Sequence, residues 1–222
     1  MEGLDLAHAL ILWDFNGTLI DDVSVCVDCI NTLLSRRNLK TMSIDEYRDA
    51  FDFPVRGFYE RFGFDFQKES YDSIADEWIQ EYHSQMRTRM RLRVGARELI
   101  NALDASGIRQ GVLSAYKEDS LRVALQGLGL GGRFDPIIGG GDYHANGKLD
   151  AARERLATIN VPLCDIVLIG DTVHDFDVAT SLGMSCILIS GGHQSENRLS
   201  ACDSPVFSSY DSPELKKYLR LP

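Results

Sequence analysis

The sequence predicts an α/β protein: a doubly wound, mainly parallel sheet with an inserted all-helical cap. Two observations support this class. Short apolar runs, typical of buried parallel strands, alternate with longer segments whose apolar residues recur at helical spacing. The stretch 20–93 breaks this alternation, because it contains helical patterns and no convincing strand. Alternating strands and helices indicate parallel β-α-β units, and hence a Rossmann-like sheet covered on both faces.

The strands are predicted from the short apolar runs. The first, Ala7–Trp13, is almost wholly apolar and ends at Asp14. Comparable runs follow at Gln110–Ser114, Pro136–Ile138, Ile166–Asp171 and Ser185–Ser190, with a possible strand at 206–207. Helical patterns lie between and after them, at Glu98–Ser106, Ser120–Leu128, Leu149–Ile159, Phe176–Leu182 and Pro213–Leu219. The chain therefore continues after the insertion as alternating helices and strands.

The insertion is predicted to contain four helices. Apolar stripes at helical spacing run through 23–34 and, over a longer stretch, through 71–86. Between them, Ser43 and Glu46 match a capping box, and Pro54 can start a further helix. Because the insertion follows the carboxyl end of a strand, it should cover the crevice where such folds bind ligands. The predicted domains are a core, residues 1–19 and 94–222, and a cap, residues 20–93.

Composition excludes several classes of protein. Of 222 residues, 44% are apolar and 25% charged, as expected of a globular chain. The net charge of −10 disfavours nucleic-acid binding, since the nucleic-acid backbone has the same sign. No run approaches the ~18 apolar residues of a membrane span, the start lacks a basic secretory signal, and five scattered cysteines suit a reducing compartment. We expect a cytoplasmic monomer or homodimer without nucleic-acid or membrane partners.

The segment after the first strand could bind an anion. Asp14 ends a buried strand, where a carboxylate needs a partner. Gly17 permits close approach of the backbone and Thr18 supplies a hydroxyl, so the turn can present N–H donors to an anion. An ordinary strand-to-helix connection would also explain such a turn.

A second acid at a strand end favours the functional interpretation. The strand Ile166–Asp171 also ends in an acid, and Asp175 follows four residues later. If the two strands are neighbours, Asp14 and Asp171 converge at one edge of the sheet. Clustered carboxylates repel one another, whereas carboxylate oxygens and water together suit the hard, octahedral ion Mg²⁺. We therefore predict a Mg²⁺ site at this edge.

Ser114 and Lys148 complete the predicted site. Ser114 ends a strand, so its hydroxyl should point to the same edge. Lys148 lies at the start of a helical pattern, where the helix dipole does not demand a positive charge. A typical lysine is explained by solvation at the surface, and neither residue would be informative alone. Their order along the chain, between the two strand-terminal acids, favours one common site.

This order of residues resembles the haloacid dehalogenase superfamily of aspartyl-nucleophile phosphohydrolases, and most of all its phosphoglycolate-phosphatase-like branch. The resemblance covers nearly the whole chain, with Asp14–Leu19 as the first motif and Gly170–Asp175 as the fourth. It implies that Asp14 attacks phosphorus and that water later hydrolyses the aspartyl phosphate. The substrate implied is a small phosphorylated metabolite.

The resemblance also assigns roles to the individual residues. The predicted catalytic residues are Asp14, Asn16 and Lys148. The predicted Mg²⁺ ligands are Asp14, Asp171 and the backbone carbonyl of Asn16. The predicted phosphoryl contacts are Ser114, Lys148 and Thr18. Asp175 is expected to orient Lys148 or a metal-bound water.

Position 16 departs from the family pattern. Phosphatases of the family carry a second Asp there, which protonates the leaving oxygen and then activates water. The amide of Asn16 cannot exchange a proton near neutral pH, and general acid–base catalysis contributes ~10²–10⁴ in rate. Three hypotheses follow: a phosphatase in which His174 or a substrate group replaces the acid, a non-hydrolytic regulatory protein, or a phosphonate hydrolase that uses Lys40 or Lys68. The retained residues favour the phosphatase.

Other features have plain structural explanations. Cys26 and Cys29 lie on one helix face, where packing is expected rather than metal binding. His174 is explained equally well as the start of the following helix. The sequence 191–193 is typical of a turn, so His193 is left out of the predicted site. The alternating arginines of 87–93 are expected to form an exposed connector.

Overall fold

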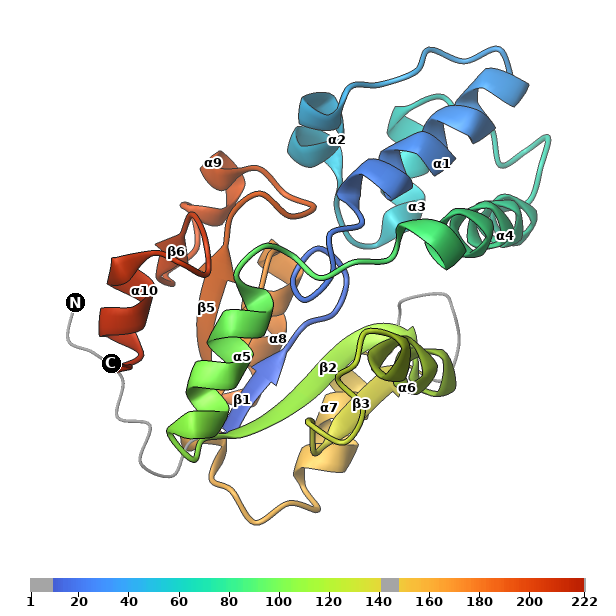
Figure 1. Ribbon diagram of the computed structural model, residues 1–222. Helices are drawn as coiled ribbons and strands as arrows, with labels where there is room; N and C mark the ends of the chain where they lie inside the picture. The colour runs from blue at the N-terminus through green and yellow to red at the C-terminus, as the bar shows by residue number, and fades with distance from the viewer. Residues whose placement is uncertain (1–9, 141–147, 222) are drawn as a thin grey trace.

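The computed structural model describes residues 10–140 and 148–221. Within these residues the core is a six-stranded parallel sheet with the order β3-β2-β1-β4-β5-β6 (Figure 1). The strands are β1 (Leu10–Trp13), β2 (Arg109–Lys117), β3 (Ile137–Gly140), β4 (Ile166–Gly170), β5 (Ser185–Ile189) and β6 (Val206–Phe207). The predicted fold class is confirmed, and the start of the first predicted strand lies outside the described residues.

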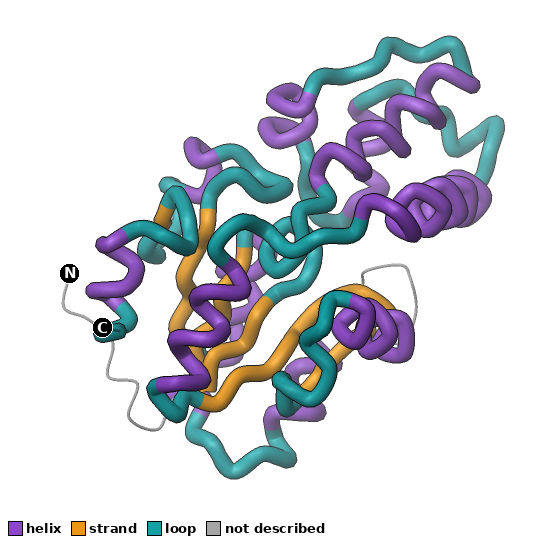
Figure 2. The backbone as a smooth tube through the Cα atoms, viewed as in Figure 1, coloured by secondary structure: helices purple, strands orange, loops and turns teal. Residues whose placement is uncertain are grey.

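Helices cover both faces of the sheet, because the central strands are apolar on both sides. Ile11 and Trp13 of β1 belong to one hydrophobic cluster, and Leu10 and Leu12 to another. The first cluster contains α5 (Ala96–Ala105), α6 (Glu118–Gly127) and α10 (Pro213–Tyr218). The second contains α7 (Lys148–Leu156), α8 (Val173–Leu182) and the short α9 (Glu196–Leu199); a 3₁₀ turn, Leu163–Asp165, precedes β4. The sheet is therefore doubly wound (Figures 1 and 2).

The insertion is all-helical and lies beyond the carboxyl ends of the strands (Figures 1 and 2). It consists of α1 (Val23–Arg36), α2 (Ile44–Ala50), α3 (Val55–Arg61) and α4 (Tyr71–Arg89). The predicted capping box begins α2: the Glu46 N–H donates to Ser43 Oγ (3.1 Å), and the Ser43 N–H donates to the Glu46 carboxylate (2.8 Å). Pro54 occupies the N-cap of α3. Four helices are thus present, as predicted.

Two antiparallel segments connect the insertion to the sheet. Ile20 and Leu92 form a bridge, the Asp21 N–H donates to the Arg91 carbonyl (3.0 Å), and the Arg93 N–H donates to Leu19 (2.9 Å). These contacts lie near the predicted boundaries, although the division into domains stays a prediction. One hydrophobic cluster extends from the sheet into the cap, so the two pack against each other. No described helix is long and apolar enough to cross a membrane.

Ion pairs hold α1 against α4. The Arg37 guanidinium lies 2.7 Å from Glu69 and 2.6 Å from Glu77, and Arg36 also reaches Glu77 (2.7 Å). Burial raises the pKa of Glu77, but hydrogen bonds from Arg37 and Arg36 outweigh it and lower that pKa below its ordinary value of 4.5.

Glu77→Gln should lower the free energy of unfolding by ~0.2–1 kcal/mol at neutral pH. Because the folded-state pKa is lowered, the carboxylate stabilises the fold above 4.5, and this contribution is lost as the pH falls through the folded-state pKa. Urea unfolding at pH 7 and at about pH 4 measures the effect, and the gap between wild type and variant should narrow at the lower pH. Glu60→Gln, in the exposed pair with Arg56, is the control. A larger loss in the control than in Glu77→Gln would contradict the prediction.

Candidate active site

Two acids lie side by side at the carboxyl edge of the sheet. β1 and β4 pair in register, and the Asp14 N–H donates to the Ile169 carbonyl (2.8 Å). Asp14 and Asp171 therefore follow the ends of two neighbouring strands. Their predicted convergence required this arrangement. Oxygens of Asp14, Asp171 and Asp175 lie within 4.8 Å of one another, and all three side chains are buried.

Lys148 is buried among these acids. Its side chain is 3% exposed, and Nζ donates to Asp14 and to Asp175 Oδ1 (2.5 Å). An ammonium removed from water must be paired, and the two carboxylates raise the pKa of Lys148 although burial opposes them. Burial, together with Asp175 and Asp171, raises the pKa of Asp14 to about 8 against the opposing effect of Lys148.

Asp175 belongs to the first turn of α8. Its Oδ2 accepts hydrogen bonds from the Thr172 N–H (3.0 Å) and hydroxyl (2.6 Å), so this capping box also aims Oδ1 at Lys148. Burial raises the pKa of Asp175, but Lys148 outweighs it and the net shift is downward. The geometry matches the predicted orienting role of Asp175, which stays a prediction.

Asp171 is held by neutral donors. Thr18 Oγ1 donates to Oδ1 (2.6 Å), and the His193 backbone N–H donates to Oδ2 (2.6 Å). Thr18 is fully buried and lies outside the residues that line the cavity described below. Its hydroxyl thus supports Asp171 here, and its phosphoryl contact stays a prediction. Gly17 has φ of 69°, and a Cβ at Gly17 would overlap the Asp171 carboxylate.

Asn16 connects the sheet to the cap. Its Nδ2 donates to Asp22 Oδ2 (2.7 Å) and to the Tyr82 hydroxyl of α4 (2.7 Å). Tyr82 in turn donates to Asp22 (2.8 Å). The amide nitrogen must face Asp22, because a carboxylate only accepts. Both amide hydrogens are therefore used within the protein.

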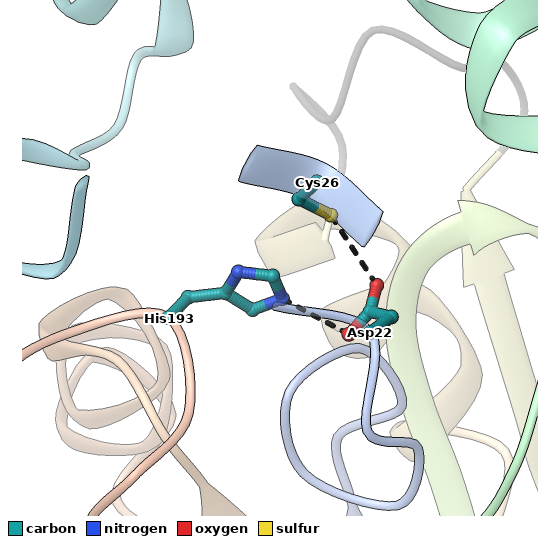
Figure 3. Close-up of side chains that lie close together, drawn as sticks. All are labelled: Asp22, Cys26 and His193. Carbon is teal, nitrogen blue, oxygen red and sulfur yellow. Dashed lines mark hydrogen bonds and ion pairs between the residues drawn. The ribbon is translucent and has the colours of Figure 1, made fainter. Parts of the chain in front are cut away.

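Asp22 and His193 form a buried ion pair that sequence analysis missed (Figure 3). His193 Nε2 lies 3.2 Å from Asp22 Oδ1, and Nδ1 lies 2.9 Å from the Tyr47 hydroxyl. Burial lowers the pKa of His193, but Asp22 outweighs it and raises the pKa to about 9. Burial raises the pKa of Asp22, but His193 and the other hydrogen-bond donors to Asp22 outweigh it, and the net shift of that pKa is downward. The signal available in the sequence was the Gly191-Gly192-His193 turn directly after a strand end.

The group of Asp22, Cys26 and His193 is a hydrogen-bond network. Oxygen, sulfur and nitrogen atoms of these residues lie within 4.8 Å of one another, a spacing that a metal could also use. Asp22 already accepts hydrogen bonds from five groups: the Gly17 N–H, the Asn16 amide, the Tyr82 hydroxyl, the Cys26 thiol and His193. Burial raises the pKa of Cys26, so its thiol stays a neutral donor. Cys26 and Cys29 are both buried, as predicted.

Arg93 is a second residue that sequence analysis missed. The arginines of 87–93 are predicted to form an exposed connector, which is wrong for Arg87 and Arg89, because they lie in the last turn of α4, and for Arg93. Arg93 is half-buried and donates to the Gly17 carbonyl and to the Ser190 carbonyl, both at 2.7 Å. The guanidinium thereby joins the turn after β1 to the end of β5. Its position in an alternating basic run gave no indication of this contact.

A cavity of about 190 Å³ lies between this edge and the cap. Asp14, Asn16, Ser114, Lys148 and Asp175 contribute to its polar end. Ser114 does not end its strand as predicted, because β2 continues to Lys117, but the pairing of β2 with β3 becomes irregular after Leu113. Ser114 is buried, and its Oγ accepts a hydrogen bond from the Tyr116 N–H (3.1 Å). The structure thus brings these predicted residues together around one space.

His174 also lines the cavity. Its ring lies 4.7 Å from that of Phe53, and its buried Nε2 has no hydrogen-bond partner among the described residues. Burial, with Lys148 nearby, lowers the pKa of His174. The imidazole is therefore neutral at pH 7 and can exchange a hydrogen bond with a ligand.

Comparisons with known proteins agree with this geometry. Residues 11–189 match the sequence model of the family described as haloacid dehalogenase-like hydrolase. A phosphoglycolate phosphatase of Rhodospirillum rubrum is 26% identical over 214 residues, 91% of this chain and 88% of that protein. An N-acetylmuramic acid 6-phosphate phosphatase of Pseudomonas putida is 22% identical over 186 residues, 82% of this chain and 83% of that protein. A structure described as a predicted phosphatase from Clostridium acetobutylicum has a TM-score of 0.75 at 19% identity, covering 96% of this chain and 98% of its own.

Gly17→Ala should disrupt the site, and Gly183→Ala should test backbone strain alone. Both glycines have positive φ, 69° and 74°, but a Cβ at Gly183 meets open space, whereas one at Gly17 overlaps Asp171. Gly183→Ala should cost ~1–2 kcal/mol from strain, and Gly17→Ala a further ~1–3 kcal/mol from overpacking. Thermal unfolding compares the two variants. Equal losses would mean that the turn does not press against Asp171.

Proposed function

Because the chain belongs to the haloacid dehalogenase-like hydrolase family, we propose that it is a Mg²⁺-dependent phosphomonoesterase that forms an aspartyl phosphate on Asp14. The resemblance predicted from the motifs is confirmed by the family match. The observation that carries the proposal is the position of Asp14, beside Lys148 at the polar end of a cavity that lies between the sheet and the cap. Relatives named as phosphatases of phosphoglycolate and of a sugar phosphate support a small phosphorylated metabolite as substrate.

The residues at the polar end suit phosphoryl transfer, which requires positioning and charge neutralisation more than covalent chemistry. Asp14 supplies a carboxylate oxygen for in-line attack on phosphorus. Lys148, which remains charged in its buried position, neutralises the equatorial oxygens of the phosphoryl group. The Ser114 hydroxyl can donate a further hydrogen bond to one of these oxygens. The cap aromatic residues around the cavity restrict the access of bulk water.

The donor set fits a divalent cation. Three buried carboxylates, Asp14, Asp171 and Asp175, lie together with one ammonium, that of Lys148, which pairs with Asp14 and Asp175. Asp22 and His193 pair with each other, so the site carries a surplus of negative charge that hard oxygen ligands and Mg²⁺ would balance. We propose that Asp14, Asp171 and the Asn16 carbonyl hold the ion, with Asp175 behind Lys148. When bound, Mg²⁺ supplies charge neutralisation for the incoming phosphate.

Proton transfer is the part of the mechanism that position 16 does not supply. Asn16 has both amide hydrogens engaged with Asp22 and Tyr82. His174 is the candidate replacement among the cavity residues, because its neutral imidazole can take a proton from attacking water. A substrate whose leaving group needs no proton would remove the demand for an acid.

The other two hypotheses have less support. Lys40 and Lys68, the candidates for a Schiff base in phosphonate cleavage, have side chains 87% and 84% exposed and pair with Glu46 and Asp65. Neither lysine lines the cavity. A non-hydrolytic regulatory protein would not need the nucleophile and the buried lysine side by side.

Asp14→Asn should abolish Mg²⁺-dependent phosphate release from a panel of phosphomonoesters, by on the order of 10⁶-fold, the scale for loss of a covalent nucleophile. Asn16→Asp should preserve or raise the rate. The new carboxyl would lie beside Asp22, and two carboxyls in contact share a proton, which leaves an acid protonated near neutral pH. An undiminished rate in Asp14→Asn would refute the mechanism.

Mg²⁺ should raise the melting temperature of the wild type and not that of Asp171→Asn. At 100 times its Kd, an ion that binds the folded state alone stabilises it by about 2.7 kcal/mol. The effect should grow as the pH rises toward 8, because the ion competes with the proton of Asp14, whose pKa is raised to about 8 without metal. Asp150→Asn, at an exposed position on α7, is the control and should respond like the wild type. Equal Mg²⁺ shifts in all three proteins would place the metal elsewhere.

A further inference from the structure

The cavity is polar at one end and aromatic on its walls. Asp14, Ser114 and Lys148 lie at the polar end, where the phosphoryl group must sit for attack. The walls come mostly from the cap, and their aromatic members include Phe51, Phe58, Tyr59, Tyr71, Trp78 and Tyr82. The whole space, polar end included, is about 190 Å³, the same scale as the ~150 Å³ of an engineered apolar cavity that binds benzene, so it has room for no more than one ring beside the phosphoryl group. A ring-sized group attached to phosphate therefore fits.

Two wall tyrosines, Tyr82 and Tyr47, have their hydroxyls engaged within the protein. The Tyr82 hydroxyl donates to Asp22, and the Tyr47 hydroxyl lies 2.9 Å from His193 Nδ1. Trp78 stacks on Tyr82, with ring centroids 4.9 Å apart and planes 16° from parallel. Such a wall suits offset stacking with a flat apolar group.

The cavity does not suit a second negative charge. Among the described residues, the cations that line it are already paired: the Lys148 ammonium contacts Asp14 and Asp175, and His193, whose pKa is raised, pairs with Asp22. The undescribed residues 141–147 contain no lysine or arginine in the sequence. Basic residues of the cap pair elsewhere: Arg36 with Glu77, Arg37 with Glu69, Arg56 with Glu60, Arg89 with Asp28. A carboxylate beside the phosphate, as in phosphoglycolate, would meet acids and rings.

Position 16 independently restricts the leaving group. With both amide hydrogens engaged, Asn16 can offer a substrate only its acceptor oxygen. An aliphatic alkoxide is nearly as basic as hydroxide, the conjugate base of water with pKa about 15.7, and needs a proton as it leaves. A phenol ionises near pKa ~10, so a phenolate leaves without that help.

We propose that the substrates are small aryl phosphates, monoesters in which the phosphoryl group is carried by an uncharged phenolic ring. This inference rests on the proposed phosphatase function and names its substrate class. The ring lies among the cap aromatics, and the phosphoryl group lies between Asp14, Ser114 and Lys148.

The chemistry balances without an acid at position 16. The bond between Asp14 oxygen and phosphorus forms while the bond between phosphorus and the aryl oxygen breaks. The electron pair stays on the phenolate, which takes its proton from solvent water after release. A water then adds to phosphorus as His174 takes one of its protons, the Asp14 carboxylate leaves, and His174 returns the proton to the product, which departs as dihydrogen phosphate.

Three phosphate monoesters and one acyl phosphate distinguish the effect of the ring from the effect of the leaving group. Phenyl phosphate has a ring and a phenolate leaving group, and benzyl phosphate has a ring and an alkoxide leaving group. Acetyl phosphate has no ring and a good leaving group, and phosphoglycolate has no ring, an alkoxide leaving group and an additional carboxylate. Steady-state kinetics with Mg²⁺ should give KM values at least about 10-fold lower for the two ring esters, the discrimination expected of an apolar pocket. The kcat values should be higher for phenyl and acetyl phosphate.

Two substitutions should move these parameters separately. Trp78→Ala should raise KM about 10-fold for the ring esters and leave acetyl phosphate unchanged. Phe66→Ala is the matched control: Phe66 is a cap aromatic that contacts Arg56 and the wall residue Tyr71 but does not itself line the cavity. Asn16→Asp should raise kcat/KM for benzyl phosphate by ~10² or more relative to kcat/KM for phenyl phosphate, because kcat/KM reports the step in which the leaving group departs. Thermal unfolding verifies that each variant is folded.

The measured rates distinguish failure of the aryl-phosphate assignment from failure of the proposed phosphatase function. Phosphate release from phosphoglycolate with kcat/KM equal to or above that of phenyl phosphate would overturn the aryl assignment while leaving the phosphatase intact. Efficient turnover of a phosphotyrosine peptide, with KM as low as that of phenyl phosphate, would overturn the restriction to small substrates. Mg²⁺-dependent release from none of the esters by folded wild type would overturn the proposed function itself.

Discussion

The buried ammonium of Lys148 organises the site. A charge removed from water is stable only when it is paired, and Lys148 lies between the carboxylates of Asp14 and Asp175. Three elements deliver these groups: Asp14 follows β1, Lys148 begins α7, and Asp175 lies in the first turn of α8. The pairing therefore determines where two helices begin relative to the central strand. Because the strands are parallel, their carboxyl ends and the starts of the following helices meet at one edge, which is why one lysine can serve both acids.

The parts of the site that the sequence could predict are those determined by position along the chain. An acid directly after an apolar strand must lie at the carboxyl edge, so Asp14 and Asp171 could be located from the strands alone. Lys148 required the order of residues as a whole, because its helix start is not by itself unusual. The sheet and the four cap helices followed from the periodicity of apolar residues, which the tertiary structure does not override here.

The parts that could not be predicted depend on contacts between distant segments. Asp22 has the sequence position of a helix N-cap, yet its side chain caps nothing and instead pairs with His193, 171 residues away. The Thr18 hydroxyl donates to the Asp171 carboxylate, a contact that spacing along the chain cannot reveal. Arg93 lies in a basic run that suggests solvent, and only the packed structure brings it to the Gly17 carbonyl. Each contact joins segments that are far apart along the chain.

The contacts between the cap and the sheet explain why an amide, rather than a carboxylate, suits position 16. A carboxylate there would lie 2.7 Å from the carboxylate of Asp22, and the repulsion would have to be relieved by a shared proton. An amide instead donates to Asp22 and to Tyr82 of the cap, so the closed arrangement of cap and sheet is satisfied without a substrate. The same hydrogens cannot then serve a leaving group. Stability of the closed cap and proton transfer thus compete at Asn16, a conflict often found at active sites. Because the chain has an asparagine at position 16, a substrate must have a leaving group that departs without a proton. The basicity of the leaving group is therefore the substrate property to which this site is most sensitive.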